Sequence, residues 1–150
     1  MELYIVQHGL AKNPEEDPER SLTDEGKHQT KSMRPLVKNR NIAEVWHSGK
    51  LRALQTVEVL TEGWEAPAFI RVVDDLKPND DPALILNQLG SSKGNLMIVG
   101  HKPHLPKLAG KLLVGDENRP IVEIINSGVL CLSGHDKEWN ILWYRLPEIS

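Results

Sequence analysis

Short apolar segments alternate along this chain with segments of helical periodicity, and this alternation constrains the fold more than any other feature. The early β-α-β-α order predicts an α/β protein, in which helices cover both faces of a mostly parallel sheet as a three-layer α/β/α sandwich. Only five residues separate the last two apolar segments, which predicts an antiparallel hairpin. The predicted strands, several of them rich in Val, Ile or Trp, are residues 2–7, 43–47, 69–73, 95–100, 128–133 and 139–145.

The predicted helices lie between these strands. One begins at the cap residue Thr23, and Pro35 inside it is expected to kink or shorten it. Another opens at Asp81, because aspartate followed by proline is a typical helix start. The clearest periodicity comes last, where apolar residues recur at i, i+3, i+4, i+7 and i+8. The four helices are predicted over residues 23–40, 51–62, 81–89 and 103–114.

Length and composition limit the classes of function. The chain has 150 residues, which predicts a single domain over residues 1–150. Its net charge of -3 argues against nucleic acid or an anionic membrane as a partner. The apolar runs are too short to span a bilayer, and the first residues do not resemble a signal peptide, so we expect a cytoplasmic protein. The lone cysteine, Cys131, excludes an internal disulfide and a cysteine metal cluster.

Polar residues follow two of the predicted strands at the point where each strand ends. Gln7-His8-Gly9 follows the first strand, and His101 follows residues 95–100. In open α/β sheets, ligands bind beyond the carboxyl ends of the strands. If these two strands are neighbours, they lie ~4.8 Å apart and bring both imidazoles to one place.

Two arginines lie in segments that can reach the same edge. Arg20 belongs to a loop before a predicted helix, and Arg52 lies in the first turn of another. Guanidinium groups bind phosphate oxygens in bidentate geometry, and a neutral imidazole is a competent nucleophile near pH 7. Helix N-termini near residues 50–52 and 102–104 can add backbone donors for an anion. This set of groups predicts a site that binds a phosphoryl group and transfers it.

Four motifs resemble, in order and spacing, those of the histidine phosphatase superfamily with its phosphoglycerate-mutase-like fold. They are His-Gly at 8–9, Arg-x-Leu-Thr-x-x-Gly at 20–26, Leu-Arg-Ala-x-Gln-Thr at 51–56 and Gly-His-x-Pro at 100–103. The resemblance extends from residue 1 to at least residue 115. The short chain, without the cap insertions of larger members, is similar to the SixA-type phosphohistidine phosphatases.

The resemblance implies a role for each matching residue. His8 would attack phosphorus in line and become phosphorylated. Arg52, Arg20 and His101 would hold the equatorial oxygens and stabilise the transition state, and water would then hydrolyse phospho-His8. Such enzymes need no metal and no other cofactor.

Gln7 departs from the family signature, which is Arg-His-Gly. A glutamine in the phosphate-binding position offers amide donors but no charge. A charge-assisted hydrogen bond contributes ~1.5–3 kcal/mol against ~1 kcal/mol for a neutral one, a difference of roughly tenfold in rate if nothing compensates. Lys102 and Lys12 are candidates to restore the charge.

Three functions stay open from the sequence. The first is a metal-independent phosphatase that acts through phospho-His8 on phosphohistidine in a signalling protein, such as a phosphotransfer domain. The second is a phosphatase for small phosphate esters, which would need a carboxylic acid such as Asp75, Asp80 or Asp81, although helix capping alone explains Asp81. The third is a phosphate- or phosphoprotein-binding module with weak turnover, which Gln7 motivates.

The remaining chemistry-bearing residues have plainer interpretations. We expect His47 and His104 at the surface or the pocket rim, with no zinc site, because no His-Glu-x-x-His motif accompanies them. His28 and His135 are expected to be solvated, and Cys131 to lie in a core strand. The polar, proline-containing run of residues 13–20 predicts a flexible loop at the pocket rim. The four tryptophans, Trp46, Trp64, Trp139 and Trp143, are expected to pack against the core.

Overall fold

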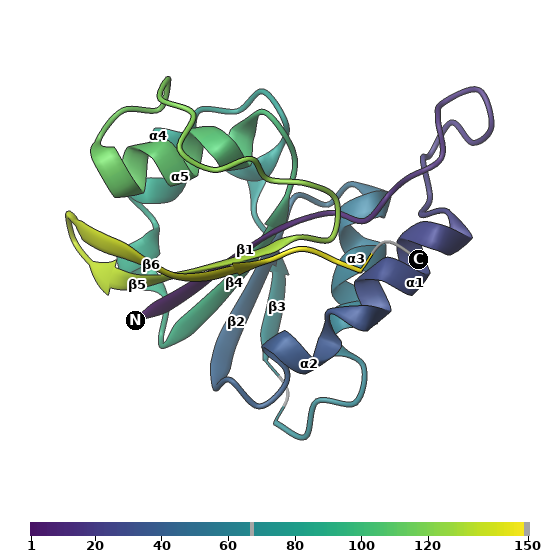
Figure 1. Ribbon diagram of the computed structural model, residues 1–150, viewed down its shortest axis with the longest axis horizontal. Helices are drawn as coiled ribbons and strands as arrows, with labels where there is room; N and C mark the ends of the chain where they lie inside the picture. Colours follow the sequence, from purple (N-terminus) through teal and green to yellow (C-terminus); the bar gives the residue numbers. More distant parts are fainter. Residues whose placement is uncertain (67, 149–150) are drawn as a thin grey trace.

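A single mixed sheet organises the chain in the computed structural model, which describes residues 1–66 and 68–148 (Figure 1). The strand order is β3-β2-β4-β1-β5-β6, with parallel pairing among the first four strands and antiparallel pairing of β5 with β1 and of β6 with β5. The predicted α/β fold and the terminal hairpin are therefore confirmed. The strands are β1 (Glu2–Gln7), β2 (Ile42–His47), β3 (Phe69–Val72), β4 (Asn95–Gly100), β5 (Val129–His135) and β6 (Glu138–Arg145).

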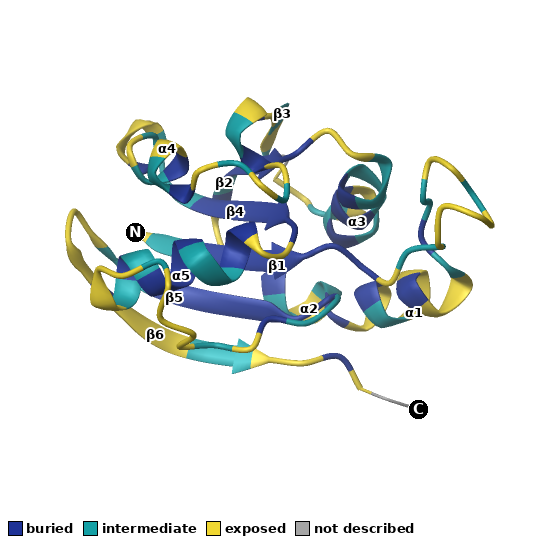
Figure 2. Cartoon of the chain, turned by 90° about the horizontal axis from the view of Figure 1, so that it is seen from above, coloured by how far each residue is buried: buried dark blue, intermediate teal, exposed yellow. Residues whose placement is uncertain are grey.

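Each face of the sheet carries its own apolar cluster, so the molecule has three layers. Along β1, Leu3 and Ile5 belong to one cluster, whereas Tyr4 and Val6 belong to the other, as the two-residue repeat of a strand requires. Helices α4 (Pro82–Leu86) and α5 (His104–Val114) cover the first face. The second face is covered by α1 (Asp24–Ser32), α2 (Arg34–Val37) and α3 (Leu51–Thr61). In Figure 2 the central strands β1, β4 and β5 are coloured mostly as buried.

The expected break in the first helix is confirmed. The Thr23 side chain accepts a hydrogen bond from the main-chain N of Gly26 at 2.9 Å, which caps α1. The helix ends at Ser32, and a second short helix starts at Arg34 with Pro35 in its first turn. Proline cannot donate the hydrogen bond that would continue one helix through this point.

Helix α4 is shorter than predicted. The Asp81 side chain caps it by accepting from the Ala83 main-chain N at 3.0 Å, but the helix ends at Leu86. A separate turn of 3-10 helix covers Leu89–Ser91. Within the described part of the chain, no helix is both long enough and apolar enough to cross a membrane.

Candidate active site

The two strand-end histidines meet at the carboxyl edge of the sheet. Strands β1 and β4 are parallel neighbours with Gln7 opposite Gly100, so the residues that follow them leave the sheet together. The His8 main-chain N donates to the Gly100 carbonyl at 3.0 Å. The imidazole rings of His8 and His101 lie with centroids 5.0 Å apart and planes inclined by 52°. The adjacency of the two strands brings both rings to one place, as the sequence-based hypothesis required.

The His8 ring has a defined tautomer. Its Nδ1 lies 2.7 Å from the Gly9 carbonyl oxygen, and a carbonyl can only accept, so Nδ1 carries the proton. The lone pair of Nε2 is then free. Burial lowers the pKa of His8 to about 4; the charges of Arg52 and Arg20 act in the same direction, whereas the hydrogen bond to Gly9 opposes them. His8 is therefore neutral and nucleophilic at pH 7.

The turn after His8 is fixed against two helices. The main-chain N of Gly9 donates to the Thr56 hydroxyl at 2.9 Å, and that hydroxyl donates to the Arg52 carbonyl at 2.7 Å. A Cβ atom at Gly9 would lie 2.6 Å from Oγ1 of Thr30 on α1, which leaves no room for a larger residue. The glycine of the His-Gly motif is thus required by close packing, and Thr56 ties the nucleophile to the helix that carries Arg52.

His101 lies in a similarly buried setting but has a different partner. Its Nε2 lies 2.5 Å from the Ser48 hydroxyl, and its Nδ1 has no hydrogen-bond partner among the described residues. Burial lowers the pKa of His101 to about 3, and the neighbouring His8 and Arg52 add to this effect. In the free protein His101 is therefore a neutral group, and an anion bound nearby would favour its protonated form.

Arg20 and Arg52 line one cavity, together with Lys50 and one acidic residue, Glu19. The Nε of Arg20 donates to the Lys12 carbonyl at 3.0 Å, and the residue has a positive φ of 54°. The Nε of Arg52 is buried without a partner in the described chain. Burial lowers the pKa of Arg52, and the charge of Arg20 adds to this effect. Arg20 and Arg52 repel each other, and the Arg52 guanidinium has an unused donor. Both features make the site suited to an anion.

Gln7 is buried at the end of β1, beside His8 in the sequence. Its main-chain carbonyl accepts from the Ser127 main-chain N at 3.0 Å, whereas its side-chain Oε1 has no partner among the described residues. Of the candidates to replace its missing charge, Lys102 forms an ion pair with Glu123 at 3.5 Å. That pairing argues against Lys102 as the substitute.

Two histidines lie elsewhere than the sequence suggested. His47 and His104 were expected at the surface or the pocket rim, but they are 4% and 0% exposed, respectively. His47 is the last residue of β2, and its Nδ1 accepts from the Gly49 main-chain N at 3.1 Å. His104 begins α5 one turn before Leu108, on the face of the helix that packs on the sheet. His47 is buried because it belongs to a central strand, and His104 is buried because it lies on the apolar face of α5.

The sequence reasoning missed two hydroxyl-bearing residues of this site. The Ser48 hydroxyl contacts His101, and the cap position of α3 belongs to Lys50. Thr56, which connects Gly9 to α3, was given no role of its own. Ser48 had one usable signal, because it follows a predicted strand at the same edge as His8 and His101.

The candidate acids are held in local hydrogen bonds. Asp75 accepts from the Gln88 amide at 3.1 Å, and Asp80 accepts from the Lys77 main-chain N at 2.9 Å. Asp81 caps α4. The charges of these three aspartates act on His104, where they oppose the lowering of its pKa by burial. In residues 1–66 and 68–148, no group of three or more His, Cys, Asp or Glu side chains is placed to hold a metal ion.

The fold and this pair of histidines define a class of protein, and comparison with known families agrees. The family model of the histidine phosphatase superfamily (branch 1) matches residues 3–77, which is half of the chain. The chain belongs to this superfamily, and that membership supports phosphatase chemistry.

Solved structures of several phosphatases share the fold over nearly their whole length. The protein histidine phosphatase SixA, in complex with tungstate, is 24% identical with a TM-score of 0.85, covering 98% of this chain and 97% of that one. The alpha-ribazole phosphatase from Shigella flexneri is 13% identical, with a TM-score of 0.79 and coverage of 98% and 96%. A mycobacterial glucosyl-3-phosphoglycerate phosphatase is 15% identical, with a TM-score of 0.76 and coverage of 97% and 99%. Among curated proteins, none matches this chain.

Proposed function

We propose that this protein is a metal-independent phosphatase that works through a phosphohistidine intermediate on His8. We further propose that its substrate is a phosphohistidine side chain of a signalling protein, such as a phosphotransfer domain. The observation that carries the proposal is the contact of His8 Nδ1 with the Gly9 carbonyl, which leaves Nε2 free for attack beside His101. The arginine-lined cavity supports the same chemistry.

In the first step, Nε2 of His8 attacks phosphorus and forms a new P–N bond. The P–N bond of the substrate breaks, and its electron pair returns to the substrate imidazole, which leaves as a neutral ring when its other nitrogen carries a proton. Arg20 and Arg52 bind the phosphoryl oxygens, and His101 adds a hydrogen bond or, once an anion is bound, a positive charge. Stabilisation of the transferring group in this way is the main requirement of phosphoryl transfer.

In the second step, water attacks phosphorus and the P–Nε2 bond breaks. The electron pair returns to Nε2, and the water proton leaves, so that inorganic phosphate is released. Because the Gly9 carbonyl keeps a proton on Nδ1, the departing His8 ring is neutral and needs no additional acid.

The surroundings of the candidate acids favour phosphohistidine over phosphate esters. An alkyl ester oxygen leaves readily only when an acid of the enzyme protonates it, whereas a phosphohistidine ring that is protonated at its other nitrogen leaves as neutral imidazole without such an acid. Asp75, Asp80 and Asp81 are occupied in local hydrogen bonds and act on His104. The charged side chains that act on His8 are the two arginines.

The test compares phosphate release from two substrates in the presence of a chelator. A phosphohistidine-bearing phosphotransfer domain and glycerol phosphate, an alkyl ester with a poor leaving group, are each incubated with the wild-type protein and with His8→Ala. We expect rapid release from the phosphotransfer domain by the wild type alone, and slow ester hydrolysis. Faster hydrolysis of the ester would redirect the assignment to small phosphorylated molecules. Tungstate binding without turnover of either substrate would instead indicate a binding module.

A further inference from the structure

The replacement of the signature arginine by Gln7 leaves the site with one cation fewer than the family pattern. A phosphoryl group carries close to two negative charges near neutral pH, and charge-assisted hydrogen bonds are roughly twice as strong as neutral ones. Gln7 provides an amide whose Oε1 has no partner in the described chain, and an amide cannot supply the charge. A compensating cation would have to come from another segment that reaches the bound phosphoryl group.

Lys50 has the required position. It is the cap residue of α3, its side chain is exposed, and it lines the same cavity as Arg20 and Arg52. Its main-chain N donates at 3.3 Å to the Ser48 hydroxyl, which in turn lies 2.5 Å from His101. The backbone that carries Lys50 is thus fixed to one of the two site histidines.

The ammonium of Lys50 is available to an anion. Within residues 1–66 and 68–148 it forms no ion pair, whereas Lys102 is paired with Glu123 and Lys77 with Asp80. Burial is the main cause of the lowered pKa of His101, followed by the charges of His8 and Arg52, and the charge of Lys50 adds to them. A flexible four-carbon side chain at the cavity edge can place a point charge against a phosphoryl oxygen.

We propose that Lys50 is a phosphate-binding residue that supplies the positive charge lost with the arginine-to-glutamine exchange at position 7. The assignment rests on the proposed function, because it presumes that a phosphoryl group is bound by Arg20 and Arg52 while His8 attacks it. It predicts an energetic coupling between positions 7 and 50, since one cation at either position satisfies the same oxygens.

A double-mutant cycle tests this coupling. Lys50→Met, Gln7→Arg and the double variant are compared with the wild type in two assays, kcat/KM for phosphohistidine hydrolysis and the Kd for tungstate by calorimetry. We expect Lys50→Met to lower both kcat/KM and tungstate affinity by about tenfold in the Gln7 protein, but by less than about threefold beside Arg at position 7. Lys77→Met removes an exposed, ion-paired lysine and is the matched control, expected to change neither.

The conservative variant Lys50→Arg keeps the test independent of Gln7→Arg, which replaces a buried side chain and can impair folding. Lys50→Arg should retain activity and tungstate affinity within about threefold, because the charge is preserved. Equal losses from Lys50→Met in both position-7 backgrounds, unchanged tungstate affinity, or a loss seen with Lys102→Met instead would each overturn the assignment. If the wild type hydrolyses no substrate, the proposed function fails, and the tungstate arm still decides the role of Lys50.

Discussion

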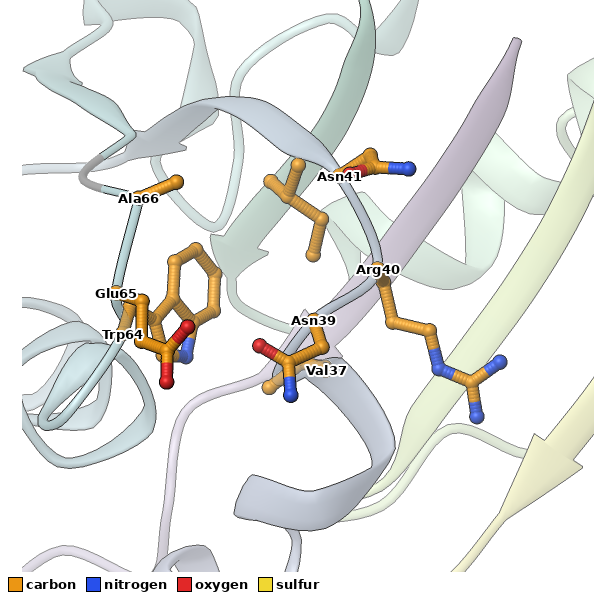
Figure 3. A pocket seen from close by; sticks show the side chains of 8 residues that line it. Val37, Asn39, Arg40, Asn41, Trp64, Glu65 and Ala66 are labelled. Atoms are coloured by element: carbon orange, nitrogen blue, oxygen red, sulfur yellow. The ribbon is translucent and has the colours of Figure 1, made fainter.

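Polar side chains are buried at one end of the central sheet and exposed at the other. At the carboxyl ends of β1, β2 and β4, polar side chains are buried and form hydrogen bonds to side chains or main-chain groups of other elements. At the opposite end, Figure 3 shows a cavity between the start of β2 and the segment after α3, around the indole of Trp64. The polar residues that line it, Asn39, Arg40, Asn41 and Glu65, are exposed.

The contrast teaches which observation identifies a functional site. A concave surface occurs at both ends, so shape alone does not separate them. Burial of a polar atom without a partner costs roughly 1–3 kcal/mol, and such atoms are therefore uncommon without a reason. In the described chain the carboxyl end holds such atoms on Gln7, Arg52, His101 and His104, whereas the cavity in Figure 3 holds one, on Trp64. Unused hydrogen-bonding capacity points to a ligand at the carboxyl end.

Removal of the nucleophile should give the largest effect on activity, because the carboxyl end of the sheet then loses its catalytic group. His8→Ala is expected to lower kcat for phosphohistidine hydrolysis by at least about a thousandfold, because no covalent intermediate can then form. The measurement is single-turnover phosphate release, with acid-labile labelling of the protein as a second readout. His28→Ala, at an exposed histidine of α1, is the matched control and should keep full activity. Comparable losses in both variants would remove His8 from the mechanism.

A methyl group at Gly26 should give the next largest effect, on stability. Its Cβ would lie 2.2 Å from the Leu10 carbonyl oxygen, where α1 packs against the segment that follows His8 and Gly9. We expect Gly26→Ala to lower the free energy of unfolding by about 3 kcal/mol, although alanine ordinarily favours a helix. The control is Gly90→Ala, whose Cβ would meet nothing within 4 Å and which should change stability by less than about 0.5 kcal/mol. Urea titration of both variants gives the comparison.

The elements of this fold could be predicted because their signals are local. The apolar run before Gln7 ends where β1 ends, and Pro35 breaks the helix where its missing N–H requires a break. The strand order could not be predicted in this way. Strand β4 lies between β1 and β2, and nothing within the three segments specifies that insertion. The proximity of His8 and His101 therefore depended on the pairing of β1 with β4, which the sequence alone did not specify.

The motif residues of the candidate site could be predicted from the sequence, but the residues that hold them in position could not. The nucleophile and the arginines stand in recognisable patterns, whereas Ser48 and Thr56 acquire their roles from contacts 53 and 47 residues away in the sequence. The burial of His104 was missed because a polar residue at a helix start is usually solvated. Its true environment depends on which face of α5 packs on the sheet.

Acidification should lower the free energy of unfolding by a smaller amount than the Gly26→Ala substitution does, through the histidines of the carboxyl end. Burial holds the pKa of His8 at about 4 in the folded protein, against 6.5 in the unfolded chain. Between these values the unfolded chain binds a proton that the folded protein does not, so stability falls as the pH falls from 6.5 towards 4. We expect His8 to contribute a loss of about 2 kcal/mol between pH 6.5 and pH 5.

Urea titrations at several pH values without phosphate measure this dependence. Burial also lowers the pKa of His47, His101 and His104, so the wild type should lose more stability than one histidine accounts for. His8→Ala should show a shallower decline with falling pH than the wild type, whereas His28→Ala should follow the wild type. Parallel curves for wild type and His8→Ala would mean that His8 is not buried in its neutral form.

Truncation of Arg40 should have the smallest effect. It tests the end of the sheet that lies opposite the candidate active site. Figure 3 shows its side chain extending away from Trp64, and its guanidinium carbon lies 5.9 Å from the centroid of the Trp143 ring. Arg40→Ala removes this cation–π contact and should lower the free energy of unfolding by about 0.5 kcal/mol. Because Arg40 lies at the opposite end of the sheet from His8, kcat/KM for phosphohistidine hydrolysis should stay within about twofold of the wild type. A loss of activity as large as that caused by Lys50→Met would mean that the cavity in Figure 3 communicates with the phosphoryl site, and the two ends of the sheet would then have to be treated as one functional unit.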